Sequence, residues 1–106
     1  MSELFDWDQA NRSHIAEHGV SPEEAEQVVL NEPLDLTLQQ RDGEERTVQV
    51  GETDGGRILV VVTTWRRRKI RVVTAFPAKQ RLRNFYERYK REHDNGGEDG
   101  DSKVPQ

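Results

Sequence analysis

"RILVVVTTWRRRKIRVVTAF", residues 57–76, contains two β-branched runs separated by a cluster of cations. The first run is continuous, as is typical of a central strand that is covered on both faces. The second run leads directly to Pro77, which lacks the N–H group that a sheet ladder needs and therefore ends the strand. The segment "WRRR" between the runs predicts a turn, so the two runs form an antiparallel hairpin.

Two further strands are expected before this hairpin. In "LDLTL", residues 34–38, leucines alternate with polar residues, which indicates a half-buried strand. "RTVQVGE", residues 46–52, follows the dipeptide Asp42-Gly43, which favours a hairpin turn. Since "TDGG" predicts another short turn before residue 57, the four strands form an antiparallel meander.

Two short helices are expected on the N-terminal side of the sheet. Asp8 is placed as the N-cap of the first helix, and Gly19 as the residue that follows its last turn. In "SPEEAEQVVL", Ser21 is the N-cap and Glu24 completes a capping box. Both signals place helix starts before the strands begin.

A last helix is expected at residues 78–92, where Leu82, Phe85, Tyr86 and Tyr89 share one face. The fold class is therefore α+β, with two N-terminal helices, a four-stranded antiparallel meander and a C-terminal helix. Residues 1–92 form a single domain. Residues 93–106 are acidic and almost free of aliphatic side chains, so we expect a disordered acidic tail.

The composition fits a small soluble protein. The chain has 106 residues, of which 32% are hydrophobic and 34% are charged, so its core is modest and its surface heavily ionised. It contains no cysteine, which excludes disulfides and thiolate chemistry. No apolar run is long enough to cross a membrane, and the first residues are acidic where a signal peptide is basic. We therefore expect a cytoplasmic protein with no membrane partner.

Charge is segregated along the chain. Residues 1–46 contain twelve acidic side chains and three arginines, a net charge of −9. Residues 47–91 contain three acidic side chains and twelve lysines or arginines, a net charge of +9. Residues 92–106 contain five acidic side chains and one lysine, a net charge of −4. The basic half favours an anionic ligand that the overall charge of −4 conceals.

Four motifs resemble a known family. "FDWDQAN", "EHGVSPEEA", "GETDGGRILVVV" and "IRVVTA" occur in this order between residues 5 and 75, and the resemblance covers about residues 5–90. The chain is similar to BrnT toxins, a branch of the RelE-like ribonuclease toxins in bacterial type II toxin–antitoxin pairs. The resemblance implies the same order of elements and a RelE-like fold. It also implies cleavage of messenger RNA without a metal or other cofactor, and neutralisation by a cognate BrnA-like antitoxin.

The resemblance breaks down at the end of the last strand. Relatives commonly have Ser-Ala-Arg there, with the arginine serving the RNA site, but this chain has Thr74, Ala75 and Phe76. Two functions remain open. One is a metal-independent endoribonuclease toxin, and the other is a catalytically inactive BrnT-like scaffold that binds nucleic acid or protein. A homodimer and a toxin–antitoxin heterotetramer are both left open.

Cations supply the candidates for phosphate binding. When the 2′-hydroxyl attacks the neighbouring phosphate, the phosphorane gains negative charge, and guanidinium groups suit it because they bind phosphate through two hydrogen bonds. The catalytic candidates are Arg66, Lys69 and Arg71, and Arg71 also matches an arginine that recurs in the family motif. The RNA-binding candidates are Arg67, Arg68, Lys79, Arg83 and Trp65. The alternatives are a solvated hairpin turn for the cations and a cover over the sheet edge for Trp65.

Proton transfer has two weaker candidates. His18 matches the His-Gly end of the first helix in the family and is a candidate acid or base, although it also suits a helix cap. Glu44 is a candidate base for the 2′-hydroxyl, although it also suits a solvated turn. His14 and His18 share a helix face, but no third metal-ligand pattern accompanies them, so no metal site is expected.

Overall fold

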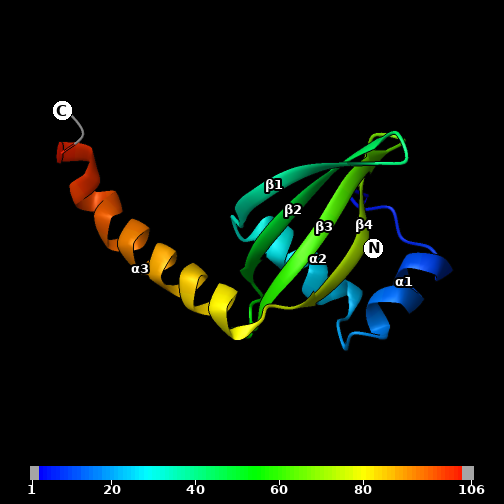
Figure 1. Ribbon diagram of the computed structural model, residues 1–106, viewed down its shortest axis with the longest axis horizontal. Helices are drawn as coiled ribbons and strands as arrows, with labels where there is room; N and C mark the ends of the chain where they lie inside the picture. The colour runs from blue at the N-terminus through cyan, green and yellow to red at the C-terminus, as the bar shows by residue number, and fades with distance from the viewer. Residues whose placement is uncertain (1–2, 104–106) are drawn as a thin grey trace.

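The computed structural model describes residues 3–103, and the side chains of residues 3–93. The elements are α1 (Gln9–Ala16), α2 (Pro22–Leu30), β1 (Leu34–Arg41), β2 (Glu44–Glu52), β3 (Ile58–Arg66), β4 (Lys69–Pro77) and α3 (Gln80–Lys103). The strands form one antiparallel sheet in the order β1-β2-β3-β4. Figure 1 shows this meander with the helices around it. The predicted α+β fold is confirmed.

Both predicted helix starts are present. Asp8 accepts a hydrogen bond from the N–H of Asn11, and Ser21 accepts one from the N–H of Glu24, each within a complete capping box. These bonds satisfy N–H groups that have no partner inside a helix. The first helix ends earlier than predicted, at Ala16, and Gly19 with a φ of 74° lies in the turn that follows.

One face of the sheet is covered by α1 and α2. Figure 1 shows α2 behind the strands and α1 beside β4. The core on this face contains Phe5, Ile15, Val20, Ala25, Val28, Leu59, Val61, Val72 and Ala75. β3 is buried on both faces from Ile58 to Thr64, with Leu59 and Val61 in this core and Val60 in a cluster on the other face, as the continuous β-branched run predicted. We call the face that α1 and α2 pack against the covered face.

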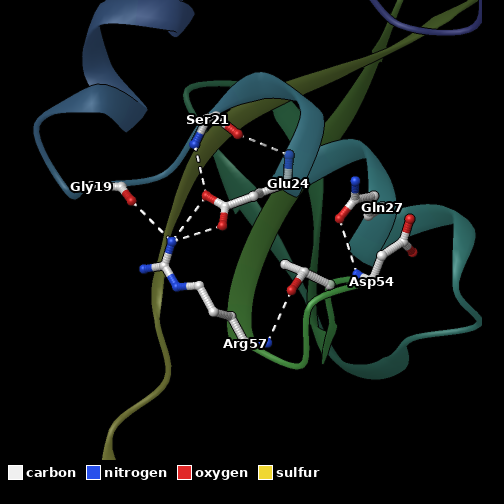
Figure 2. A network of polar contacts seen from close by, with 7 residues as sticks. Gly19, Ser21, Glu24, Gln27, Asp54 and Arg57 are labelled. Atoms are coloured by element: carbon white, nitrogen blue, oxygen red, sulfur yellow. Dashed lines mark hydrogen bonds and ion pairs between the residues drawn. The ribbon is translucent and has the colours of Figure 1, made fainter.

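A polar network ties α2 to the turn between β2 and β3 (Figure 2). Arg57 Nη1 donates to both carboxylate oxygens of Glu24, each at 2.9 Å, and to the carbonyl oxygen of Gly19 at 3.1 Å. The Gln27 side chain accepts from the N–H of Asp54 at 3.0 Å. Burial raises the pKa of Glu24, but the N–H of Ser21 and the Arg57 guanidinium outweigh burial and hold it below its usual value. The network fixes α2 over the covered face.

The other face, the open face, carries a smaller apolar cluster. Val50, Ile58 and Val60 pack there with Ala78 and Tyr86, so the first turns of α3 rest on this end of the sheet. In Figure 1 the rest of α3 projects away from the strands. α3 runs to Lys103, past the predicted helix end at residue 92. The predicted disordered tail, residues 93–106, falls mostly on residues whose side chains lie outside the described ones, and it stays a prediction.

β1 is an exposed edge strand. The predicted burial of alternate leucines is wrong, because Leu36 and Leu38 are both exposed, Leu38 by 63%. Only Leu34 at the start of the strand packs against the apolar cluster of the open face. The physical reason is coverage, since the main helix–strand contacts of α1 and α2 are with β2, β3 and β4.

A bulge in β4 determines which of its side chains share a face. Thr63 pairs with Val72 and Val62 pairs with Thr74, so Val73 is an extra residue between them. Arg71 is opposite Thr64 and Phe76 is opposite Val60. Since residues 60 and 64 of β3 point to the same face, Arg71 and Phe76 also lie on one face, although five residues separate them.

The N-terminal segment covers the outer edge of β4. Phe5 forms a parallel bridge with Ile70, the Asp6 N–H donates to the Ile70 carbonyl at 2.9 Å, and the Ile70 N–H donates to the Leu4 carbonyl at 2.8 Å. This pairing protects an edge that would otherwise be open to another chain. It also brings two acidic residues, Asp6 and Asp8, next to the cations of β4.

Candidate active site on the open face

A pocket of about 450 Å³ lies on the open face where α1 meets the sheet. Its walls come from four elements that are distant in sequence. They are Ala10, Asn11 and His14 of α1, Glu44 and Arg46 of β2, Thr64 of β3, and Arg71 and Val73 of β4. Three types of ionisable side chain, guanidinium, imidazole and carboxylate, therefore meet in one cavity.

Arg71 is the most constrained cation of this pocket. Its Nη2 donates to Asp8 Oδ1 at 3.1 Å, and its Nη1 lies 3.1 Å from Asp8 Oδ2 and 3.5 Å from Asp6 Oδ2. The side chain is 14% exposed, and Nη1 is buried without a hydrogen-bonded partner. A guanidinium has five N–H donors, so Asp8 and Asp6 orient the group and leave donors for a ligand.

Asp8 serves both α1 and Arg71. The same carboxylate caps α1 and accepts from Arg71. The Arg71 hydrogen bond, followed by the Asn11 N–H, holds the pKa of Asp8 below its usual value. Asp8 therefore stays ionised to a lower pH than an ordinary aspartate, and the position of Arg71 is linked to the start of α1.

Asn11 joins the segments around Arg71. Its side chain is buried and donates to the carbonyl oxygens of Asp6 at 3.0 Å and Val72 at 3.1 Å. It also accepts from the N–H of Asp8 at 2.8 Å. A buried amide with these three bonds fixes the N-terminal segment, α1 and β4 relative to one another.

Arg46 and Glu44 form the opposite wall of the pocket. Arg46 Nε donates to Glu44 Oε1 at 2.9 Å, and the Arg46 side chain is 23% exposed. Glu44 is the first residue of β2 rather than part of the turn. Arg46 is thus a second constrained guanidinium that faces the same cavity as Arg71.

A row of aromatic rings leads from the pocket along the sheet. The His14 ring, which lines the pocket, lies edge-on to His18 with ring centroids 5.5 Å apart. His18 in turn lies edge-on to Phe76, with centroids 6.0 Å apart. The predicted candidate His18 is therefore next to Phe76 and one ring away from the pocket, while His14 is in the wall itself.

The structure separates the remaining hairpin candidates. Arg66 Nε lies 3.8 Å from Asp6 Oδ2, so this side chain shares a carboxylate with Arg71. Arg67 and Arg68 form the exposed tip of the hairpin, with left-handed φ angles of 55° and 67°. Lys69 lines a different cavity with Asp6, Glu23 and Glu26 among its walls. The cations thus surround the N-terminal segment rather than a single point.

The other predicted RNA-binding residues lie further away. Trp65 is 72% exposed and lines a cavity with Val29 and Ile70, on the α2 side of the sheet. Lys79 lines an apolar groove at the start of α3. Arg83 donates to the Ala78 carbonyl at 3.3 Å and to the Gln80 side chain, so it stabilises the start of the same helix.

The sequence did not identify three polar residues of the pocket wall, Arg46, His14 and Asn11, as site residues, nor Asp8, which holds Arg71. Arg46 could have been found, because in "ERTVQV" it alternates with Val48 and Val50 and so shares their face. The sequence pairs His14 with His18 on one helix face but gives no sign that His14 enters the pocket. Asp8 was recognised only as a helix cap, and nothing in the local sequence near Asn11 indicates that it bonds to β4.

The described residues contain neither a cluster of metal ligands nor a membrane-spanning helix. Among them, no three His, Asp or Glu side chains gather in a way that could hold a metal ion. No helix in the described part of the chain is long and apolar enough to cross a membrane.

A family model described as a ribonuclease toxin, BrnT, of type II toxin–antitoxin systems matches residues 7–81. The match includes α1, α2 and all four strands, and it ends within the first turn of α3. The chain belongs to the BrnT family. A search of curated proteins found no match to the chain. Membership of a BrnT family of type II toxins implies an antitoxin partner, and the resemblance read from the sequence motifs is confirmed.

Proposed function

We propose that the chain is a metal-independent endoribonuclease of the RelE-like type that cleaves messenger RNA in the cytoplasm. A BrnA-like antitoxin would neutralise it. The observation that carries the proposal is the pocket itself, where two guanidinium groups meet a histidine and a carboxylate. Arg71 supports it further, because its Nη1 is held within 3.1 Å of Asp8 and 3.5 Å of Asp6 while the guanidinium still lines the pocket.

The proposed reaction is transfer of a phosphate ester within the RNA. The 2′-oxygen attacks the adjacent phosphorus, the bond from phosphorus to the 5′-oxygen breaks, and a 2′,3′-cyclic phosphate and a 5′-hydroxyl form. A base removes the proton of the 2′-hydroxyl, and an acid supplies one to the leaving 5′-oxygen. The phosphorane that forms between substrate and products carries more negative charge than the substrate. Fixed cations near it therefore lower the barrier to cleavage.

Arg71 and Arg46 suit the charge-stabilising role. Each is held by carboxylates, Arg71 by Asp8 and Asp6 and Arg46 by Glu44, so neither guanidinium must be ordered when RNA binds. Prior ordering matters because stabilisation by fixed groups needs no reorganisation during the reaction. Arg66, which shares Asp6 with Arg71, adds positive charge beside this point, whereas Lys69 lines a different cavity and takes no part in the scheme.

Glu44 and His14 suit the proton transfers. Both line the pocket, so a single bound phosphate can be near both side chains. We assign Glu44 as the base for the 2′-hydroxyl and His14 as the acid for the leaving oxygen. His18, the residue indicated by the sequence, is in ring contact with His14 and acts in this scheme through His14.

The test is cleavage of single-stranded RNA in EDTA by purified protein. Arg71→Ala should slow cleavage by about 100-fold or more, the effect of removing one donor that stabilises a transition state. Arg88→Ala, which removes an exposed cation of α3, is the matched control and should retain most activity. Cleavage that survives Arg71→Ala, or that stops in EDTA, would contradict the proposal.

One observation favours a second function. Phe76, which replaces the arginine of relatives, packs against the apolar cluster of the open face instead of adding a charge. The second candidate is a BrnT scaffold that binds RNA without cutting it. Protein that binds RNA with a steep salt dependence but leaves it intact after long incubation would support this function.

A further inference from the structure

An apolar groove lies on the open face between β4 and the start of α3. Its volume is about 450 Å³, and its walls are Val60, Phe76, Leu82 and Phe85 with Lys79 and Arg81 beside them. Phe85 is 50% exposed, whereas its neighbour Tyr86 is buried against the sheet. The ring of Phe85 is therefore held at the surface by a helix turn that Tyr86 anchors. Phe85 and Tyr86 both lie beyond the residues that match the family model.

The groove and the pocket are on the same face because of the β4 bulge. Without the extra residue Val73, side chains five positions apart would point to opposite faces, and Phe76 would lie on the covered face, against α1 and α2. With it, Phe76 is opposite Val60 and Arg71 is opposite Thr64. The two β3 residues are four apart, so the groove begins roughly 13 Å from the site of Arg71 along the strand.

A row of three contacting rings joins the two cavities. His14 belongs to the pocket, Phe76 belongs to the groove, and His18 lies between them in edge-on contact with both rings. A short stretch of single-stranded RNA can cross this distance while its bases contact the rings. The path runs from a phosphate site to an aromatic site without leaving the open face.

We propose that the groove is a nucleobase subsite, in which an unpaired base of the bound RNA stacks on Phe85 and Phe76 near the scissile phosphate. This inference rests on the proposed function, because it places the subsite on the RNA that the pocket would cleave. It gives Phe76, which lines the groove, a role in contacting RNA. The chemistry recognised is a π-face next to a phosphate, without preference for one base.

Charge favours a nucleic acid over a protein segment as the occupant. Both ionisable side chains of the groove wall, Lys79 and Arg81, are cations, and no carboxylate is among its described lining residues. Bases stack on aromatic rings with little dependence on sequence, and cations beside the rings bind the adjoining phosphates. An apolar side chain of the antitoxin is the alternative occupant.

The test compares two single-stranded oligonucleotides that cannot be cleaved. Both carry 2′-O-methyl groups and have equal length, and one of them lacks bases. The protein should bind the oligonucleotide with bases about tenfold or more tightly than the abasic one. Phe85→Leu keeps an apolar side chain but removes the ring, so it should abolish most of this difference and leave abasic binding unchanged. Tyr89→Leu, which removes the partly buried α3 ring stacked on His93, is the matched control and should keep the preference.

Each outcome separates the subsite from the nuclease. Equal binding of the two oligonucleotides by the protein, or an unchanged preference in Phe85→Leu, would overturn the subsite. If Phe85→Leu instead weakens only binding of the co-expressed antitoxin, the groove belongs to that partner and the proposal fails. Loss of the base preference in Phe85→Leu, in a protein that never cleaves RNA in EDTA, would support the subsite and refute the proposed catalysis.

Discussion

The two faces of the sheet share the same strands but have opposite surroundings. On the covered face, α1 and α2 bury Ile15 and Val28 against Leu59 and Val61, and each of these four side chains is fully or almost fully inaccessible. On the open face, the same strands end in a pocket of charged and polar groups and an apolar groove. The sequence of β3 satisfies both faces at once because it is buried throughout most of its length.

This difference indicates a division of labour between the faces. Apolar burial on the covered face, which has the larger buried cluster, stabilises the fold in proportion to the area removed from water. The open face keeps constrained cations and a half-exposed phenylalanine that contribute little to that free energy. Side chains that are ordered but still partly accessible are typical of binding sites, because they contact a ligand without prior rearrangement.

The largest expected effect is a loss of stability on the covered face. Leu59→Ala removes a fully buried side chain and leaves a cavity, so it should lower the free energy of unfolding by about 2–5 kcal/mol. Phe85→Ala removes a larger side chain from the open face and should lower it by about 1 kcal/mol or less, because half of the ring is exposed. Urea denaturation followed by circular dichroism measures both. Equal losses would contradict the division between the faces.

The second expected effect is a gain in stability at the hairpin tip. The β1–β2 tip, Asp42-Gly43, and the β3–β4 tip, Arg67-Arg68, both have left-handed φ angles, but only the first has residues that favour this conformation. Replacing Arg67-Arg68 with Asn-Gly should raise the free energy of unfolding by about 1 kcal/mol. If both arginines contact phosphates, the slope of log affinity for single-stranded RNA against log salt should also fall, by about 1.4.

Two measurements decide this second prediction. Chemical denaturation gives the change in stability, and RNA binding at several salt concentrations gives the slope. A more stable variant with a smaller slope would show that the arginines are strained in order to bind an anion. A variant with unchanged stability would show that the tip is not strained, whatever its effect on RNA.

The third expected effect is a loss of stability at the network of Figure 2. Arg57→Ala should lower the free energy of unfolding by about 1 kcal/mol, because the ion pair is partly exposed but has two hydrogen bonds to Glu24. The stability that depends on Glu24 is present above the usual pKa of this carboxyl and is lost as the pH falls through its lowered value. Stability measured from neutral to acidic pH should therefore fall less in Arg57→Ala than in the parent protein. Arg91→Ala, on the exposed surface of α3, should change neither quantity.

Local signals in the sequence predicted the elements well. Asp8 and Ser21 begin helices through short-range capping bonds, and Asp42-Gly43 forms a turn whose geometry depends on those two residues. These features involve neighbours within a few positions, so periodicity and turn chemistry are sufficient to identify them. The order of the strands followed from the short connections between them.

The site depended on features that no local pattern contains. Regular alternation would place Arg71 and Phe76 on opposite faces, and only the bulge at Val73 brings them together. The capture of Arg71 by Asp8 requires the N-terminal segment to pair with β4, across more than sixty residues. The prediction that alternate leucines of β1 are buried was wrong for a similar reason. Whether Leu38 is covered depends on where α2 lies and not on the alternation of leucines. Tertiary placement decided each case.

The smallest expected effect concerns the ionisation of Asp8 on the open face. Since Arg71 and the Asn11 N–H lower its pKa, Asp8 should titrate below its usual value of 3.8 in the parent protein. In Arg71→Ala the pKa should rise toward 3.8, but remain slightly below it because the Asn11 N–H still donates to the carboxylate. The contribution of the ion pair to stability is present above pH 3.8 and disappears as the pH falls through the lowered pKa.

Carboxyl carbon shifts followed by NMR measure the titration directly, with Glu23, an exposed carboxylate of α2, as an internal control. An Asp8 pKa that does not respond to Arg71→Ala would mean that the carboxylate does not hold the guanidinium in solution, and Arg71 would then have to be ordered by the RNA itself.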